Sequence, residues 1–204
     1  ARWLVTVDHA TNRVPDWVAG GDLGVAPADM GRHIAYDVGA LGVGAVLAER
    51  LGAPLIHSDF SRLVIDPNRG DDDPTLIMRL SDGAVVPGNA GVDEAERERR
   101  IARFWRPYDD AIRAAIDAGI AGGRRPILFS VHSYTPIWRG RPRPWHCGVL
   151  WDADPRRWAG LTTCRPSAST SSRTGTICRR PGGDVQPSPA TAVLQPRCGQ
   201  HVVR

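Results

Sequence analysis

Two short runs of apolar residues lead directly into histidines. The first run covers residues 3–8 and is followed by His9, and the second covers residues 127–131 and is followed by His132. Apolar runs of this length are typical of buried β-strands. In open α/β sheets, ligands bind outside the carboxyl ends of the strands. The two histidines are therefore candidates for one functional site, although each alone is more often a structural histidine.

The rest of the chain up to about residue 164 alternates between helical and strand-like patterns. Apolar spacing predicts a helix from an N-cap at Asp29 through Ala48. Asp93 is expected to cap a second long helix that breaks at Pro107 and resumes to Ala118. Further short strands are expected at residues 53–56, 63–65 and 148–151. This alternation favours an α/β fold, in a single three-layer domain with a mixed, largely parallel sheet.

The composition of the chain changes abruptly near residue 164. Residues 165–204 contain no Phe, Trp or Tyr and are rich in Pro, Ser, Thr, Arg and Gly. Such a composition cannot bury enough apolar surface to offset its ordering entropy. We expect a folded domain over residues 1–164 that is incomplete at its C-terminal end, followed by a low-complexity basic tail. The tail is either a disordered segment or the product of a shifted reading frame, and the abrupt change favours the shifted frame.

The net charge of the chain is confined to this tail. The formal charge is +4, yet residues 165–204 hold six arginines and one aspartate, which leaves 20 arginines against 21 acidic residues in the body. The body therefore has no excess positive field to attract nucleic acid. No apolar run is long enough to span a membrane. The absence of a visible leader and of paired cysteine spacings predicts a cytoplasmic protein.

Six motifs lie in collinear order along the body of the chain. They are Val7-Asp-His-Ala-Thr-Asn-Arg-Val-Pro15, His33-Ile-Ala-Tyr-Asp-Val-Gly39, Ser61-Arg-Leu-Val-Ile-Asp-Pro-Asn-Arg69, Ser81-Asp-Gly83 with Pro87-Gly-Asn89, Val131-His-Ser-Tyr-Thr-Pro136 and Arg143-Pro-Trp-His-Cys-Gly-Val-Leu-Trp151. Together they resemble the N-formylglutamate amidohydrolase family, which is similar to the zinc carboxypeptidases. The resemblance covers residues 3 to about 160. It implies a zinc-carboxypeptidase-like (phosphorylase/hydrolase-like) fold and metal-dependent hydrolysis of an N-formyl or N-acyl amino acid such as N-formylglutamate, with release of formate.

Amide hydrolysis needs an activated water, a polarised carbonyl and a proton shuttle. One zinc ion with three protein ligands and one open position supplies the first two. His9 and His132 are the best ligand candidates, and the third ligand is either Asp37 or Asn12. In the carboxypeptidase pattern an acid stands three residues after the first histidine, but here that place holds the poorer neutral ligand Asn12. We therefore prefer Asp37, and we expect Asp8 to orient an imidazole from outside the metal.

A small-molecule substrate with a carboxylate would need a cationic anchor. The resemblance implies that Asn68 and Arg69 hold this carboxylate, since a guanidinium grips a carboxylate with two hydrogen bonds. Arg62 is the candidate to stabilise the oxyanion of the attacked carbonyl. Surface charges flanking a strand are the alternative interpretation of both arginines.

Three further residues are candidates for the same pocket. Ser133 and Tyr134 stand at the end of the second apolar run and are assigned to substrate binding. His146 precedes a predicted strand and is a candidate donor to the tetrahedral intermediate, with a packed histidine as the alternative.

Other patterns have simpler interpretations. His33 and Asp37, spaced four residues apart, would share one face of the predicted helix. The segment Gly39-Ala-Leu-Gly-Val-Gly44 looks like a nucleotide-binding loop but lies within a helical pattern and lacks the final glycine spacing. A run of arginines with interspersed glutamates predicts a solvated helix face. These arginines are Arg97, Arg99, Arg100 and Arg103.

One residue expected from the resemblance is missing. The family and its carboxypeptidase relatives take a general base from a glutamate on a late strand, whereas the last glutamate of this chain is Glu98. Residues 165–204 show neither that strand nor any glutamate. Loss of a general base typically costs about 10²–10⁴ in rate. The alternative function is therefore an inactive remnant or a carboxylate-binding module without the base, and the oligomeric state stays open.

Overall fold

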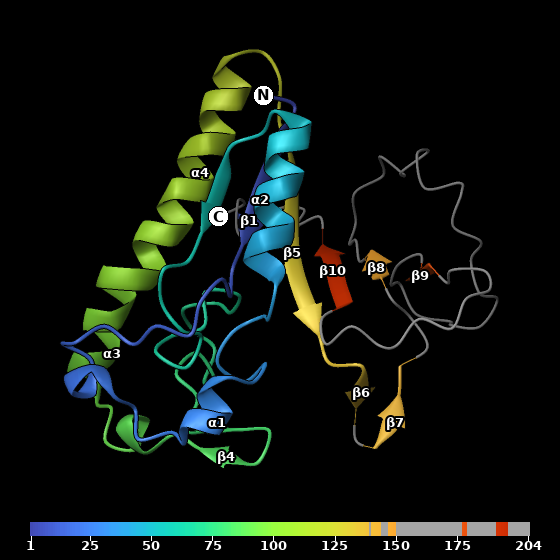
Figure 1. The fold of residues 1–204 in the computed structure, drawn as a ribbon. Helices are drawn as coiled ribbons and strands as arrows, with labels where there is room; N and C mark the ends of the chain where they lie inside the picture. The colour runs from blue at the N-terminus through green and yellow to red at the C-terminus, as the bar shows by residue number, and fades with distance from the viewer. Residues whose placement is uncertain (139, 144–146, 150–176, 179–190, 196–204) are drawn as a thin grey trace.

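A mixed six-stranded sheet organises the chain in the computed structural model (Figure 1). The structure describes residues 1–138, 140–143, 147–149, 177–178 and 191–195. The strands follow the order β2-β1-β5-β10-β8-β9. Their bounds are β1 Trp3–Val7, β2 Leu55–His57, β5 Ile127–Tyr134, β8 Cys147–Val149, β9 Ile177–Cys178 and β10 Thr191–Gln195.

Strand directions confirm the expected mixed sheet. The pairs β1–β2, β1–β5 and β8–β10 are parallel, while β10 pairs antiparallel with β5 and β9 pairs antiparallel with β8. The α/β class predicted from the sequence is confirmed, and the likeness to zinc carboxypeptidases stays a prediction. No helix within the described ranges has both the length and the apolar character that crossing a membrane would need.

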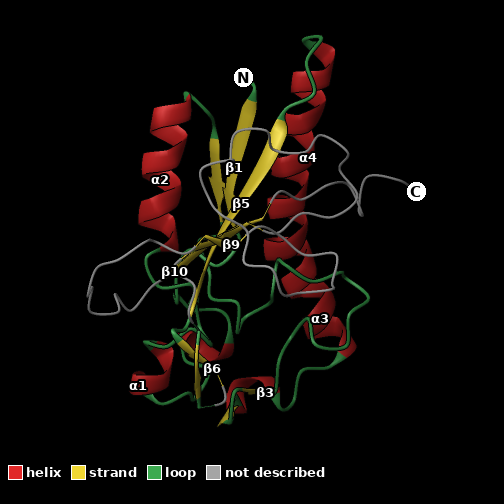
Figure 2. Cartoon of the chain, turned by 90° about the vertical axis from the view of Figure 1, so that its right-hand side faces the viewer, coloured by secondary structure: helices red, strands yellow, loops and turns green. Residues whose placement is uncertain are grey.

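Helices cover both faces of the central strands (Figure 2). Successive side chains of a strand point to opposite faces. Val5 and Val7 of β1 therefore pack with α2 (Ala40–Leu51) on one side. Leu4 packs on the other side with Tyr108 and Ile112 of α4 (Arg106–Ala121). The chain thus forms the expected three layers around β1 and β5.

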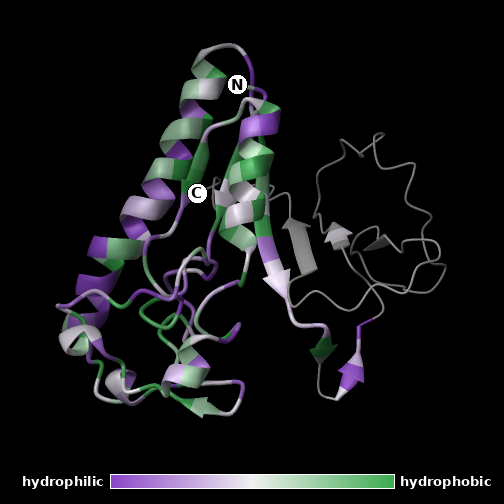
Figure 3. Ribbon diagram, viewed as in Figure 1, coloured by the Kyte–Doolittle hydropathy of each residue, from purple (hydrophilic) through white to green (hydrophobic). Residues whose placement is uncertain are grey.

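A second hydrophobic core lies among the loops beyond the carboxyl ends of the strands. It is built from buried residues of the loops and of the segment before α4. Its members are Val18, Leu23, Val25, Ala35, Phe60, Leu63, Val64, Ile65, Leu76, Val86, Ile101 and Phe104. Figure 3 shows β5 changing from hydrophobic to hydrophilic as it approaches this region. Polar residues thus stand at the junction of the sheet and the loop core.

Short elements connect the loops of this second core. They are the 3-10 turn η1 (Ala19–Gly21), helix α1 (Pro27–Met30), the hairpin β3 (Leu80–Ser81) with β4 (Ala84–Val85), and the 3-10 turn η2 (Pro87–Asn89). A second hairpin, β6 (Ile137–Trp138) with β7 (Arg141–Pro142), follows β5.

The helix predicted from Asp29 to Ala48 is wrong in its first half. Residues 31–39 form turns, and α2 begins only at Ala40. Gly39 precedes it with a left-handed φ of 79°, which ends any continuous helix before this point. Ile34, which supplied part of the helical spacing, is buried without being helical. His33 and Asp37 therefore do not share a helix face.

The strand predicted at residues 63–65 is also wrong. Residues 62–64 form a turn, and Leu63, Val64 and Ile65 are completely buried in the loop core. An apolar run this short signals burial, which a strand and a packed turn satisfy equally well. The predicted strand 53–56 corresponds to β2, and the start of the predicted strand 148–151 lies in β8.

The second long helix is one continuous rod in three parts: α3 (Glu94–Arg100), a π-helical segment η3 (Ile101–Trp105) and α4. The Asp93 cap has the expected geometry, since its side chain accepts a hydrogen bond from the Glu96 N–H at 2.8 Å. The predicted break at Pro107 is wrong, because the proline stands in the first turn after the wider π-helical segment.

Two further expectations are corrected. Arg100 is not on a solvated face: it is 1% exposed, with its guanidinium bonded to Glu96, Asn89 and the Val64 carbonyl. The tail does contribute strands, because β9 and β10 join the sheet. The longer of the two, β10, spans five residues and pairs with β5 and β8. The domain boundary at residue 164 stays a prediction.

Candidate functional site

Three residues that the sequence singled out meet at the carboxyl ends of the central strands. His9 follows β1, His132 lies near the end of β5, and Asp37 comes from the turns before α2. All three are buried, and each offers one ligand atom that lies within 4.8 Å of the other two. Asp37 is held there because its N–H donates to the His9 carbonyl at 2.9 Å.

Asp37 stands between the two imidazoles. Its Oδ2 lies 2.9 Å from Nδ1 of His132 and 3.3 Å from Nδ1 of His9. The same oxygen accepts a hydrogen bond from the Ser133 N–H at 3.2 Å. One carboxylate oxygen therefore faces both Nδ1 atoms.

These residues fit a metal ion. Nδ1 of His9 is buried, and no hydrogen bond to it exists within the part of the chain that the structure describes. Its ion-pair contact with Asp37 at 3.3 Å is not a hydrogen bond, and a buried polar atom without one is costly unless another ligand satisfies it. Two imidazole nitrogens and one carboxylate oxygen are a donor set that zinc favours and that leaves a fourth position open.

Two further carboxylates hold the outer nitrogens of the imidazoles. Asp66 Oδ1 accepts from Nε2 of His9 at 2.7 Å, and Asp8 Oδ2 lies 3.1 Å from Nε2 of His132. Both aspartates are fully buried. A carboxylate on the remote nitrogen fixes the tautomer and orientation of a metal-binding histidine. This arrangement leaves both Nδ1 atoms facing Asp37.

Asp8 lies where the sequence predicted an orienting carboxylate, whereas Asp66 was missed as a site residue. The signal for Asp66 was present, because it directly follows the buried run 63–65, as Asp8 ends the first apolar run. Sequence reasoning treated that region as a short strand with a binding turn, so the carboxylate at its end received no role.

The pKa values of these groups reflect close opposite charges. Burial by itself lowers the pKa of His132, but its hydrogen bonds to Asp37 and Asp8 raise it to about 9. Burial likewise opposes protonation of His9, and the negative charge of Asp66 raises its pKa nonetheless. Burial favours the neutral forms of Asp37 and Asp66, yet contacts with the histidines hold the pKa of both carboxyls well below the ordinary value. All four shifts favour the charged forms of these groups.

The two predicted arginines both contact Asp66. NH2 of Arg62 donates to Asp66 Oδ2 at 2.6 Å, and its NH1 lies 3.8 Å from Asp37 Oδ1. Nε of Arg69 lies 3.5 Å from Asp66 Oδ2, and its NH1 donates to Asp73 at 3.3 Å. Both Nε atoms are buried without a hydrogen bond in the described chain. Asn68 donates its backbone N–H to Asp66, and the residue is otherwise exposed.

The other predicted residues lie at different distances from this centre. Ser133 contacts Asp37 through its backbone, and the ring of Tyr134 lies under the guanidinium of Arg143, 4.9 Å from its centroid. Asn12, the alternative third ligand, donates its side-chain amide to the Met30 carbonyl at 2.9 Å. His146 lies outside the described residues.

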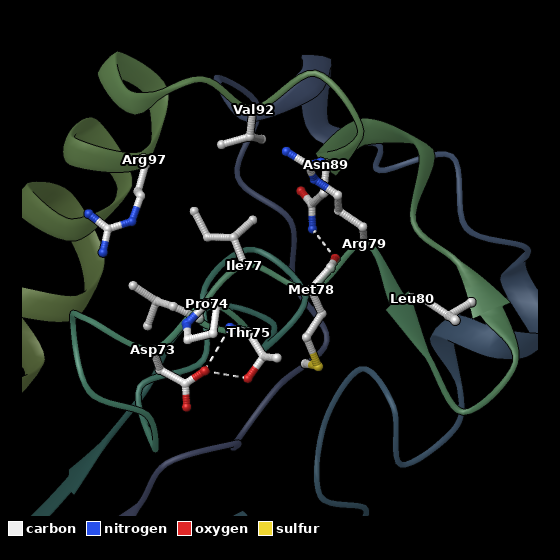
Figure 4. Close-up of a pocket in the computed structure, with 11 residues that line it drawn as sticks. Asp73, Pro74, Thr75, Ile77, Met78, Arg79, Leu80, Asn89, Val92 and Arg97 are labelled. Carbon is white, nitrogen blue, oxygen red and sulfur yellow. Dashed lines mark hydrogen bonds between the residues drawn. The ribbon is translucent and has the colours of Figure 1, made fainter.

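A cavity of about 390 Å³ lies on the loop side of the molecule, and none of His9, Asp37 and His132 lines it (Figure 4). Two of its polar side chains are engaged, since Asn89 donates to the Met78 carbonyl and Asp73 accepts from Thr75. The remaining lining residues are Pro74, Leu76, Ile77, Arg79, Leu80, Val92 and Arg97. It is not the site where the histidines meet.

The fold and this group define an α/β protein with a buried candidate metal site at the carboxyl ends of its central strands. A family model, N-formylglutamate amidohydrolase, matches residues 1–175. The chain therefore belongs to the N-formylglutamate amidohydrolase family. The match extends past residue 160, where the resemblance visible in the motifs was expected to end.

The chain is also similar to two known proteins. The chain is 31% identical over 144 residues to an N-formylglutamate deformylase of Pseudomonas putida, an alignment that covers 64% of this chain and 51% of that protein. It is also similar to the crystal structure of gene product Atu2144 from Agrobacterium tumefaciens, with a TM-score of 0.70 and 33% identity. That alignment covers 75% of this chain and 60% of the other. The chain thus spans about half the length of the curated relative.

Proposed function

We propose that this chain is a metal-dependent hydrolase that cleaves an N-formyl or N-acyl amino acid such as N-formylglutamate and releases formate or the corresponding acid. The observation that carries the proposal is the buried group of His9, Asp37 and His132, whose ligand atoms lie within 4.8 Å of one another. Family membership and the deformylase relative support the hydrolytic reaction.

We propose zinc as the metal, held by Nδ1 of His9, Nδ1 of His132 and a carboxylate oxygen of Asp37. A zinc ion supplies an activated water and polarises the amide carbonyl. The chain's own contribution is orientation, because Asp66 and Asp8 fix the two imidazoles from behind.

Arg62 is proposed to stabilise the negative charge that develops on the attacked carbonyl oxygen. Its guanidinium donates to Asp66 and lies 3.8 Å from Asp37, so it is next to the proposed metal ligands. Its side chain is 22% exposed, so a bound substrate would reach part of the guanidinium. A positioned donor of this kind stabilises the transition state more than the ground state.

Arg69 is proposed to bind the substrate carboxylate, and Asn68, Ser133 and Tyr134 are proposed as further substrate-binding residues. Its guanidinium is about one-third exposed and pairs with Asp66 and Asp73 in the substrate-free chain. Its Nε, like that of Arg62, has no hydrogen bond within the described ranges. A substrate carboxylate that approaches the exposed part of this guanidinium would replace Asp73 as its partner in a charge-assisted hydrogen bond.

Formate release in the presence of zinc tests the proposal. The wild-type chain is loaded with zinc, given N-formylglutamate, and assayed for formate, beside a His132→Ala variant and a matched His57→Ala variant. His57 is an exposed histidine of β2 outside the group. We expect His132→Ala to lose both zinc binding and formate release, and His57→Ala to retain both. Full zinc occupancy in His132→Ala would overturn the ligand assignment.

A second candidate function is a carboxylate-binding module without turnover. It is favoured by the engagement of Asp8, Asp37 and Asp66 in contacts with the two imidazoles. The same assay separates the two functions when binding of N-formylglutamate is measured by calorimetry. Binding without formate release, at saturating zinc, would favour the module over the hydrolase.

A further inference from the structure

Tyr108 reaches into the candidate site from the opposite layer of the fold. It lies in the first turn of α4, and its hydroxyl donates to Asp8 Oδ1 at 2.7 Å. The other oxygen of Asp8 lies 3.1 Å from Nε2 of His132 and accepts from the Ser130 hydroxyl at 3.0 Å. Tyr108 is 6% exposed and Asp8 is completely buried. The chain Tyr108–Asp8–His132 is therefore shielded from water.

We propose that Tyr108 is a positioning residue that fixes the metal-binding orientation of His132 through Asp8, an inference that rests on the proposed function. A carboxylate can rotate about its last bond, so one contact alone does not define the direction of both oxygens. With Oδ1 held by the phenol, Oδ2 is fixed on the imidazole. The imidazole in turn presents Nδ1 to Asp37 at 2.9 Å. Outer partners of this kind usually matter for metal affinity.

The π-helical segment before α4 sets the direction of Tyr108. Residues Ile101–Trp105 form this segment between α3 and α4. A π-turn adds one residue to the helix, and each residue turns an α-helix by about 100°. The insertion lets Arg100, at the end of α3, point into the loop core while Tyr108 points to Asp8. One rod thus connects the loop core to the sheet side of the site.

The test is the zinc dissociation constant of a Tyr108→Phe variant of the full chain, measured by chelator competition. The ring and its packing stay, and only the hydroxyl is lost. We expect zinc binding to weaken about tenfold, the lower end of the effect of outer-sphere partners. At saturating zinc, kcat for N-formylglutamate should fall while KM stays unchanged, because Arg69 is untouched.

An Ile112→Val variant is the matched control for a merely structural role. Ile112 lies one turn further along α4 in the same hydrophobic cluster and has no bond to Asp8. It should lower the melting temperature without changing the zinc dissociation constant. If Tyr108→Phe and Ile112→Val change zinc affinity equally, the positioning role is overturned.

A double-mutant cycle with Asp8→Asn tests whether Tyr108 acts through Asp8. In the Asp8→Asn background, adding Tyr108→Phe should change zinc affinity far less than it does alone, because coupled residues are not additive. Full additivity would overturn the proposal. The measurement of zinc affinity does not depend on turnover. A wild-type chain that binds zinc but releases no formate would therefore refute the proposed hydrolase. The positioning role of Tyr108 would still be supported by weaker zinc binding in Tyr108→Phe than in the wild type.

Discussion

At the residue scale, the candidate site balances negative and positive charges. Three buried aspartates (Asp8, Asp37 and Asp66) surround His9 and His132. The pKa values of both histidines are raised, which favours their doubly protonated, cationic forms in the metal-free chain. A divalent cation brings the same positive charge as these two protons. Metal binding therefore exchanges protons for zinc without leaving a buried carboxylate uncompensated.

This exchange predicts a pH dependence of stability. The folded-state pKa of His132, about 9, is raised above the unfolded value, so its stabilisation is present below about pH 6.5 and is lost as the pH rises through about 9. The lowered pKa values of Asp37 and Asp66 contribute stability that is present above about pH 4 and lost in more acidic solution. In urea titrations, the metal-free chain should lose stability between pH 6.5 and 9. A rise in the unfolding midpoint over that range would contradict the ionised network.

Replacing the anchoring guanidinium should change substrate binding more than turnover. In Arg69→Ala, KM for N-formylglutamate should rise about tenfold or more, since a charged hydrogen bond contributes roughly 1.5–3 kcal/mol. The same comparison with N-formylleucine, which has only the α-carboxylate, shows which carboxylate Arg69 binds. An increase in KM for both substrates would indicate the α-carboxylate, and an increase for N-formylglutamate alone would indicate the side-chain carboxylate. Arg113→Ala, which removes a cation paired with Asp109 on α4, is the control. An unchanged KM for both substrates would show that Arg69 is not the anchor.

Residue identities at the site were accessible from the sequence where polar residues follow apolar strands. His9, His132 and Asp8 follow this rule, and the structure places them together. Asp66 also follows an apolar run, but that run folds as a buried turn and not as a strand. The contact between Asp66 and His9 could therefore not be predicted from the sequence. Tyr108 carries no local signal, because its contact with Asp8 joins residues 100 positions apart.

At the element scale, helices were predicted well where caps and periodicity agree. The Asp93 cap and the body of α2 are examples. The error at residues 31–39 has a physical cause: Ile34 satisfies helical spacing, but its burial comes from the loop core. Hydrogen bonds from Asp37 to His9 and from Arg62 to Ala35 hold this segment in turns. Such long-range bonds override local helix propensity.

The packing of α2 on β1 gives a prediction with an internal control. A Cβ on Gly44 would lie 2.5 Å from Cγ2 of Val7, which is completely buried, whereas one on Gly42 meets nothing within 4 Å. Gly44→Ala should therefore destabilise the chain by about 1–3 kcal/mol through overpacking. Gly42→Ala should stabilise it by up to about 1 kcal/mol through helix propensity. Thermal unfolding of both variants checks the pair, and equal shifts would refute the close approach.

At the scale of the whole molecule, the candidate site lies where two separately packed cores meet. The sheet core supplies His9 and His132, and the loop core supplies Asp37, Arg62 and Asp66. The α/β class followed from alternating patterns along the chain. The loop core did not, because its apolar residues are scattered between turns and have neither helical nor strand spacing. Its existence depends on contacts that no local window contains.

The separation of the candidate ligands along the chain has a consequence for the order of events in folding. Asp37 and His132 lie 95 residues apart, and His9 belongs to a third segment. An unfolded chain therefore offers zinc no local chelate, and loop closure must come first. Zinc should therefore bind after most of the native structure has formed. It should then lower the unfolding rate and leave the folding rate unchanged.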